Sequence, residues 1–239
     1  MDMETTILLL SAVISYLIGS ISFSRIISKI ADPDVDLENV EMPAIGGGTH
    51  QLKMVGATTA SVKLGPKVGC TIGILDILKG FLPVLALKLI YPDQYYHLIS
   101  AVFVVLGHNY PIYHRFRGGV GISSIYGGFF VVDFVGILVS TLASLVFGFF
   151  IVRDMVVAYV SGVWFMLLWL ILFKGDWPHI LYGIAINIVF LLGLVPEIKD
   201  YVQNKQDGEV DMQEAMRGTP MGRGMLKIMD FFGLNISKD

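Results

Sequence analysis

Long apolar runs alternate with short polar segments along most of this chain. The runs cover residues 6–30, 68–91, 95–113, 134–152, 155–173 and 179–194, with a shorter one at 122–132. A helix needs about 20 mostly apolar residues to cross the hydrocarbon core of a bilayer. The pattern therefore predicts an all-α, polytopic integral membrane protein with about seven transmembrane helices, of which the fourth is short.

The composition supports this prediction. Of the 239 residues, 54% are hydrophobic and 15% are charged, and the mean hydropathy is +0.69. The N-terminus carries Asp2 and Glu4 and lacks the basic segment of a signal peptide, so we expect the first run to remain as a helix. The single cysteine, Cys70, excludes a disulfide within one copy of the chain. A net charge of −3 argues against a nucleic-acid partner.

The distribution of cations predicts the orientation in the membrane. With seven spans and the N-terminus outside, the outer loops receive only Lys88 and Lys174. The cytoplasmic side receives the tail together with a larger group of cations: Lys29, Lys53, Lys63, Lys67, Arg115, Arg117 and Arg153. Cytoplasmic loops carry an excess of lysine and arginine. We therefore expect a multi-pass protein of the cell membrane with a cytoplasmic C-terminus and with polar loops 31–66 and 107–121 on the cytoplasmic side.

The hydrophobic pattern divides the chain into a transmembrane domain, residues 1–198, and a cytoplasmic tail, residues 199–239. Near the end of the tail, apolar residues recur at helical spacing: Met225, Ile228, Met229, Phe232 and Leu234. Such spacing is typical of a helix that lies in the membrane interface. Glycines in the same stretch weaken any helix, so a loosely ordered tail is the alternative.

The loop at 107–121 concentrates candidate chemistry. Arg117 stands beside Gly118, Gly119 and Gly121, and Ser123 follows. Glycine-rich backbone can fold around an anion, and arginine can bind the oxygens of that anion. The pattern favours a phosphate held at the membrane surface. The alternative is a short loop whose arginines only fix the topology.

His108 is the imidazole nearest to both the membrane boundary and this loop. It is a candidate general base or phosphate donor, and the alternative role is a hydrogen bond to a neighbouring loop. The sequence lacks a His-x4-Asp acyltransferase arrangement, a Gly-x-Ser-x-Gly elbow, a Walker loop and a His-Glu-x-x-His helix. We therefore expect no metal and no other cofactor.

A second candidate segment precedes the second run. Gly56, Ala57, Thr58, Thr59 and Lys63 offer backbone amides, hydroxyls and an ammonium group. These donors suit the oxygens of a phosphate or an acyl phosphate. Small residues are also common where membrane helices pack closely, which is the alternative.

Asp76 and Lys79 lie inside the second run. Residues three apart share one face of a helix and can form an ion pair. Ionisable groups at membrane depth are costly and usually face the interior of the bundle. We predict an intramembrane pair with either a functional or a purely structural role.

Six short segments together resemble one family. They are residues 19–23, 56–59, 64–69, 75–80, 107–111 and 116–121. In order and spacing they are similar to the motifs of the bacterial membrane glycerol-3-phosphate acyltransferases that use acyl phosphate as the acyl donor. The resemblance covers residues 16–124 well and the remainder only by hydropathy.

The chain also departs from the family pattern. Ser22 replaces a proline, Thr59 an asparagine, Val62 an arginine and Val120 a lysine. Leu52 and Met54 occupy positions of a serine and an asparagine, after an apparent insertion of about ten residues. Residues 194–198 replace a His-Arg-Glu-Asn segment. Many of these positions would hold glycerol phosphate in the family.

The resemblance implies transfer of a fatty acyl group from acyl phosphate to glycerol 3-phosphate, giving lysophosphatidate and phosphate. It implies catalytic roles for His108, Arg117 and Lys63. It implies phosphate-binding roles for a larger set: Gly56, Ala57, Thr58, Thr59, Gly118, Gly119, Gly121 and Ser123. The expected partners are the two substrates and membrane lipid. Two alternatives stay open: a non-catalytic membrane scaffold or lipid-binding relative, and an acyltransferase for another polyol phosphate.

Overall fold

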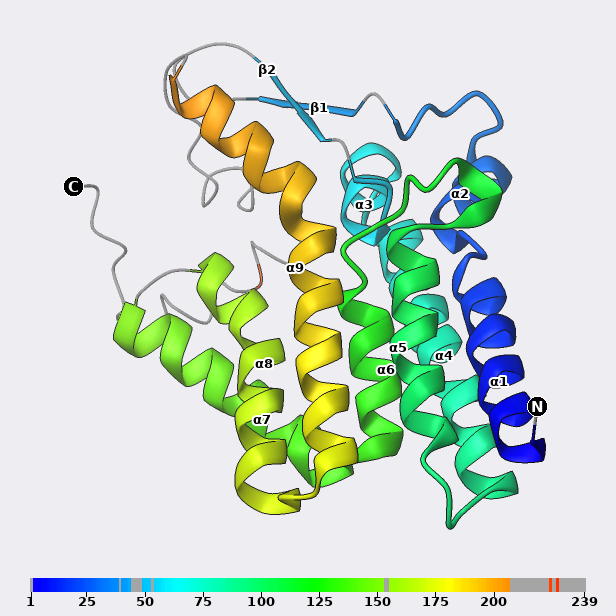
Figure 1. Ribbon diagram of the computed structural model, residues 1–239. Helices are drawn as coiled ribbons and strands as arrows, with labels where there is room; N and C mark the ends of the chain where they lie inside the picture. Colours follow the sequence, from blue (N-terminus) through cyan, green and yellow to red (C-terminus); the bar gives the residue numbers. More distant parts are fainter. Residues whose placement is uncertain are drawn as a thin grey trace.

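The computed structural model describes residues 2–38, 40–43, 49–52, 54–152 and 155–206, together with Gly224 and Lys227. A bundle of helices makes up most of the described chain (Figure 1). Its long helices are α1 (Met3–Gly19), α4 (Pro66–Ile90), α5 (Tyr96–Asn109), α6 (Ile122–Val132), α7 (Phe134–Val146), α8 (Met155–Trp169) and α9 (Trp177–Gln206). The predicted helical membrane fold is confirmed.

Within the described residues, five helical segments are long and apolar enough to cross a membrane: Met3–Ala31, Pro66–Ile90, Phe134–Val152, Val157–Lys174 and Trp177–Val195. The apolar helix Ile122–Val132 is shorter, and α5 has 14 residues. Length and apolar composition thus account for five of the seven predicted spans. Helices α5 and α6 lie in the middle of the bundle (Figure 1). Helix α5 packs against α1, α4 and α9, and α6 packs against α4, α5 and α7.

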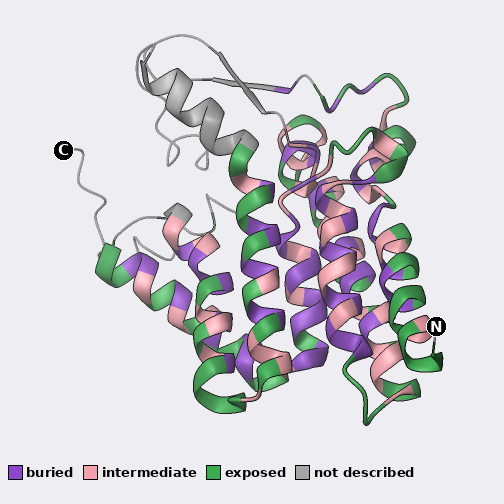
Figure 2. Cartoon of the chain, in the orientation of Figure 1, coloured by how far each residue is buried: buried purple, intermediate pink, exposed green. Residues whose placement is uncertain are grey.

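Exposed residues run along the outer faces of the helices, and buried residues lie between them (Figure 2). Many of the exposed residues are large and apolar. Leucines and isoleucines along α1, α7 and α9 are exposed, among them Leu10, Leu142 and Leu181. Several serines are buried instead, including Ser15 and Ser100, whose hydroxyls lie 2.7 Å apart between α1 and α5. Apolar side chains outside and satisfied polar groups inside are the arrangement that lipid solvent favours.

The first predicted span, residues 6–30, is two helices rather than one. α1 ends at Gly19, and the amphipathic α2 (Phe23–Ala31) begins three residues after Ser20. At the break the Ser20 hydroxyl donates to the Tyr16 carbonyl at 2.8 Å. Small polar residues at 20, 22 and 24 interrupt the apolar pattern, and they place motif backbone at the end of the bundle.

Glycines set the close approach of two helix pairs. A Cβ at Gly19 would lie 2.2 Å from the Val104 carbonyl oxygen, and one at Gly107 would lie 2.2 Å from that of Tyr16, so α1 and α5 touch through backbone. Gly80 and Gly127 allow the same contact between α4 and α6. Small residues permit such packing where the hydrophobic effect cannot drive helix association. The two pairs fix the frame around the motif segments.

The polar stretch before α4 contains regular structure that its composition did not predict. Strands β1 (Val40–Pro43) and β2 (Thr49–Leu52) pair antiparallel, with Val40 opposite Leu52. Helix α3 (Ala57–Leu64) follows, and Gly65, at φ +92°, turns the chain into α4, which has a proline in its first turn. The all-α prediction therefore omitted a small hairpin outside the bundle.

Both predicted polar loops lie at the end of the bundle opposite the N-terminus (Figure 1). The end of α9 lies on that same side. Helix α9 continues to Gln206, beyond the domain boundary placed at residue 198. π-helical turns, Phe147–Val152 and Leu170–Lys174, complete the spans begun by α7 and α8. The predicted interfacial helix of the tail lies outside the described residues, apart from Gly224 and Lys227.

Candidate active site

The predicted motif segments converge at one end of the bundle. A cavity there is lined by Gly19, Ser20, Ile21, Ser22, Ser24, Val55, Asp76, Lys79, His108, Pro111 and Gly118. These residues come from the α1–α2 break, the start of the α3 segment, α4, the end of α5 and the loop that follows. The cavity measures about 10 Å³, close to the smallest space that holds one water molecule. It is too small for glycerol phosphate. The residues that line it therefore contact one another and do not enclose a substrate-sized space.

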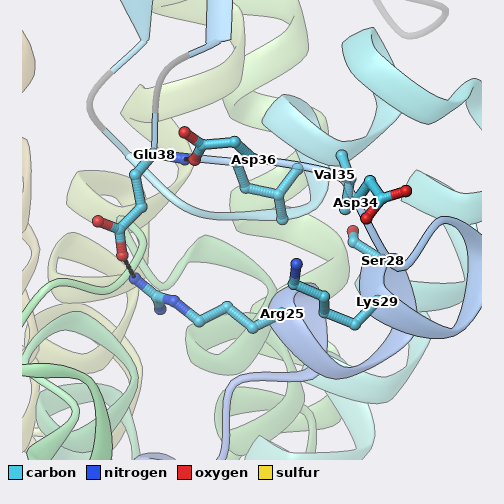
Figure 3. Close-up of a pocket in the computed structure, with 8 residues that line it drawn as sticks. Arg25, Ser28, Lys29, Asp34, Val35, Asp36 and Glu38 are labelled. Carbon is cyan, nitrogen blue, oxygen red and sulfur yellow. Dashed lines mark hydrogen bonds and ion pairs between the residues drawn. The ribbon is translucent and has the colours of Figure 1, made fainter.

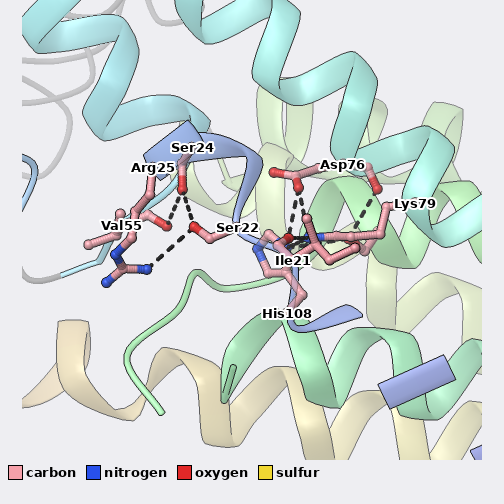
Figure 4. A network of polar contacts seen from close by, with 9 residues as sticks. Ile21, Ser22, Ser24, Arg25, Val55, Asp76, Lys79 and His108 are labelled. Carbon is pink, nitrogen blue, oxygen red and sulfur yellow. Dashed lines mark hydrogen bonds and ion pairs between the residues drawn. The ribbon is translucent and has the colours of Figure 1, made fainter. Parts of the chain in front are cut away.

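A buried ionic network forms the floor of the site (Figure 4). Lys79 Nζ lies 2.9 Å from Asp76 Oδ1 and 2.9 Å from His108 Nδ1, and it donates to the Ile21 carbonyl at 2.9 Å. The Asp76 and Lys79 side chains are 4% and 1% exposed. The predicted intramembrane pair is thus confirmed, and it ties α4 to the α1–α2 break and to α5.

Ser124 on α6 completes the floor. Its hydroxyl donates to the Asp76 carbonyl at 3.1 Å and lies 3.5 Å from His108 Nδ1. Four separate elements therefore meet at the Lys79 ammonium and the His108 ring. Because breaking any one contact leaves a buried polar group unsatisfied, the network fixes the relative positions of these elements.

His108 holds the glycine loop in place. Its carbonyl oxygen accepts from the Gly119 amide at 3.3 Å. A Cβ at Gly118 would lie 2.0 Å from that oxygen, and one at Gly119 would lie 2.6 Å from His108 Nε2. The loop thus lies directly on His108, and the geometry favours a positioning role over general base chemistry.

The backbone before these glycines is strained. Arg115 and Phe116 have φ of +53° and +60°, a region that side-chain-bearing residues rarely adopt. Gly121, at φ +84°, precedes α6, and a Cβ there would lie 2.4 Å from Asn109 Oδ1. Strain of this kind persists where surrounding structure imposes it, often at ligand sites. Here it turns the Arg117 side chain outward, where it is 72% exposed.

Helix α3 begins against this loop. The Val55 amide donates to the Gly118 carbonyl at 3.2 Å. Gly56 occupies the N-cap position of α3, and no side chain caps it. Helix N-termini offer backbone amides to anions, so Gly56, Ala57 and Thr58 present donors beside the loop. The Thr59 hydroxyl is already engaged with the Met54 carbonyl, so Thr59 serves the fold of this segment.

Two other predicted residues lie apart from this group. Lys63 is exposed on the last turn of α3, the end away from Gly56. Ser123 is half-buried on the first turn of α6, and among the described residues no hydrogen bond joins either side chain to the glycine loop. The structure brings together Gly56, His108 and Gly118–Gly119, with Arg117 at the rim.

The family model described as glycerol-3-phosphate acyltransferase matches residues 9–204 of this chain. The chain belongs to that family. A glycerol-3-phosphate acyltransferase of Pseudothermotoga lettingae is 38% identical over 122 residues, which are 51% of this chain and 55% of the relative. The relative from Desulfotalea psychrophila is 37% identical over 65% of this chain and 77% of its own. The matched part thus spans little more than half the length of the first relative.

Solved structures of the family share the fold. The glycerol 3-phosphate form of the integral membrane acyltransferase PlsY (YgiH) has a TM-score of 0.69 and 29% identity, covering 82% of this chain and 92% of that one. Its lysophosphatidic acid form has a TM-score of 0.67 and 26% identity, over the same shares. The predicted family resemblance is confirmed.

The structure explains two departures from the acyltransferase family pattern. Val62, where the family carries arginine, packs against the apolar cluster that includes Val35, Leu37 and Ile72. Val120, where the family carries lysine, packs against the main core. Both positions have joined apolar clusters, so cations for a phosphate must come from elsewhere in this chain.

Arg25 is the cation that the sequence pattern did not single out. It lies on α2, and its Nη2 pairs with Glu38 Oε1 at 3.1 Å while its Nη1 donates to the Ser22 hydroxyl at 3.4 Å. In the sequence Arg25 is one more basic residue at the end of a span. Only the break between α1 and α2 and the return of residues 32–38 place it at the site.

Proposed function

We propose that this protein transfers a fatty acyl group from acyl phosphate to glycerol 3-phosphate, giving lysophosphatidate and phosphate in phospholipid biosynthesis. The convergence of the motif segments on the Asp76–Lys79–His108 floor carries the proposal. The names of the family's relatives, with the glycerol 3-phosphate and lysophosphatidic acid forms of the PlsY structure, support the acceptor and the product.

The proposed reaction needs no nucleophile from the protein. The hydroxyl oxygen of glycerol 3-phosphate attacks the acyl carbonyl carbon, and the bond from that carbon to the phosphate oxygen breaks with its electron pair. The departing phosphate carries the charge, and one of its oxygens accepts the hydroxyl proton. Because acyl phosphate is already activated, positioning and stabilisation of the developing charge supply most of the acceleration.

Each part of the site has a role in this mechanism. The amides at Gly56, Ala57 and Thr58 and those of Gly118 and Gly121 bind phosphate oxygens, and Arg117 supplies positive charge. Gly119, whose amide already donates to the His108 carbonyl, lets the loop lie close to His108. His108 and the Asp76–Lys79 pair hold this backbone in place from below. We further propose that the site faces the cytoplasm and that the N-terminus lies outside.

The test is an assay of the purified protein in detergent with acyl phosphate and glycerol 3-phosphate, measuring phosphate release and lysophosphatidate by mass spectrometry. Arg117→Gln should reduce the rate about tenfold or more, whereas Lys63→Gln, at the far end of α3, should have a small effect. Wild-type phosphate release no greater than that of Arg117→Gln would overturn the proposal.

A second candidate is a non-catalytic lipid-binding relative, which the apolar packing of Val62 and Val120 favours. That protein would bind lysophosphatidate or phospholipid without consuming either substrate. Stabilisation by lysophosphatidate together with no turnover of a survey of polyol phosphate acceptors would favour this alternative.

A further inference from the structure

A carboxylate of the chain lies between two arginines at the rim of the site. Glu38 Oε1 lies 3.1 Å from Nη2 of Arg25, and Glu38 Oε2 lies 3.6 Å from Nη1 of Arg117. Arg25 belongs to α2 and Arg117 to the loop before α6, so the fold brings two cations from distant segments to one anion. Each guanidinium uses a different oxygen of the same carboxylate.

This arrangement matches the way arginine binds phosphate. Guanidinium groups bind carboxylate and phosphate oxygens with the same geometry, and a phosphate offers more oxygens and more charge than a carboxylate. We propose that Arg25 and Arg117 together bind the phosphate group of the polar substrate, and that Glu38 occupies the position of this phosphate in the free protein. The inference rests on the proposed function and adds Arg25 as a binding residue and Glu38 as an internal competitor.

A cavity adjoins the contact between Arg25 and Glu38 (Figure 3). Its volume is about 350 Å³, which falls in the range of small-molecule sites. It is lined by Arg25, Ser28, Lys29, Asp34, Val35, Asp36, Leu37 and Glu38. Two cations and three carboxylates therefore face this cavity, and the phosphate position is the one that Glu38 holds between the two arginines. The Ser28 hydroxyl is buried in its wall and has no hydrogen-bond partner in the described part of the chain. Buried polar groups are usually paired, and this hydroxyl would reach a ligand in the cavity only after a shift of the wall.

Arg25 also connects this cavity with the segment that leads into α3 (Figure 4). It donates to Ser22, whose hydroxyl lies 2.9 Å from that of Ser24, and Ser24 donates to the Val55 carbonyl at 3.3 Å. Val55 precedes the α3 N-terminus that we propose binds phosphate oxygens. A phosphate between the two arginines therefore lies beside the elements already assigned to substrate.

The contact with Glu38 is one that a ligand can displace. The Glu38 side chain is 48% exposed and that of Arg117 is 72% exposed, whereas that of Arg25 is 16% exposed. Ion pairs between exposed side chains contribute little to stability. The other acidic side chains of this segment bind its own backbone: Asp36 accepts from the Glu38 amide at 2.8 Å, and Asp32 accepts from the Asp34 amide at 3.1 Å. These bonds hold the segment in shape while the Glu38 side chain moves.

The experiment measures binding of inorganic phosphate to the purified full-length protein in detergent, by thermal shift over a range of phosphate concentrations. Glu38→Gln removes the competing charge and should tighten phosphate binding about threefold to fivefold. Arg25→Gln should weaken it about tenfold. Lys29→Gln is the matched control, because Lys29 lines the same cavity on α2 but donates to the Pro33 carbonyl, and it should change binding less than twofold.

The same variants are then assayed for the glycerol 3-phosphate KM, which should follow the order of phosphate affinities. Equal binding by Glu38→Gln and wild type, or equal losses in Arg25→Gln and Lys29→Gln, would overturn the inference. Active enzyme with a KM insensitive to Arg25 and Glu38 would refute the rim site and leave the proposed function standing. Phosphate binding in the expected order without turnover would support the rim site and refute the proposed acyltransferase function.

Discussion

The floor and the rim of the site are built on different principles. On the floor, Asp76, Lys79 and His108 are almost enclosed, and their contacts join α4 to α5 and to the α1–α2 break. At the rim, Glu38 pairs with the exposed Arg117 and with the partly buried Arg25, all three from segments that leave the bundle. A buried network fixes the positions of the helices and cannot rearrange easily. An ion pair at the surface can exchange the carboxylate of the protein for an anionic ligand. We therefore expect the floor to hold the helices in place and the rim to bind the substrate.

The largest expected effect is a loss of stability when the floor, but not the rim, is altered. Lys79→Met leaves Asp76 buried without its cation and should destabilise the protein by about 3–5 kcal/mol. The double variant Asp76→Leu/Lys79→Met should lose much less, because no unpaired charge remains. Thermal unfolding in detergent measures both, and Arg25→Gln provides the rim control with a loss of at most about 1 kcal/mol. Equal losses in the single and double floor variants would refute the pairing.

A smaller effect tests how the floor supports the glycine loop. In Gly119→Ala the new methyl group meets the His108 ring at 2.6 Å, so the loop must shift and phosphate affinity should fall about tenfold. His108→Ala in the same chain removes the obstructing ring. The double variant should therefore bind phosphate better than the sum of the single losses predicts. Additive losses would show that His108 and the loop act independently.

The sequence predicted the floor better than the rim, for a physical reason. Asp76 and Lys79 are three residues apart on one helix, so their pairing follows from local geometry. The Arg25–Glu38–Arg117 group depends on a helix break at Ser20–Ser22 and on the path of residues 32–38, neither of which has a periodic signal. Lys63 is the opposite case. It is close to Gly56 in the sequence, but α3 separates the two residues in space, because Gly56 caps its first turn and Lys63 lies in its last.

The smallest expected effect is a pH dependence at the rim. Burial, and next the charge of Arg25, lower the pKa of His114, while Glu38 acts in the opposite direction. The folded protein therefore binds this proton less readily than the unfolded chain, and stability falls as pH drops below the ordinary histidine pKa of about 6.5. His114→Asn should lose less stability than wild type between pH 7.5 and about pH 5, as measured by thermal unfolding. A larger loss in His114→Asn would contradict this sign.

The division between floor and rim is tested most directly by the kinetics of acyl transfer with glycerol 3-phosphate as the varied substrate. The account predicts that Glu38→Gln lowers KM and Arg25→Gln raises it, both with a loss of stability far smaller than that of Lys79→Met. It predicts that Lys79→Met loses activity together with folded protein. A Glu38→Gln variant with an unchanged or higher KM, or a stable and fully active Lys79→Met variant, would contradict it.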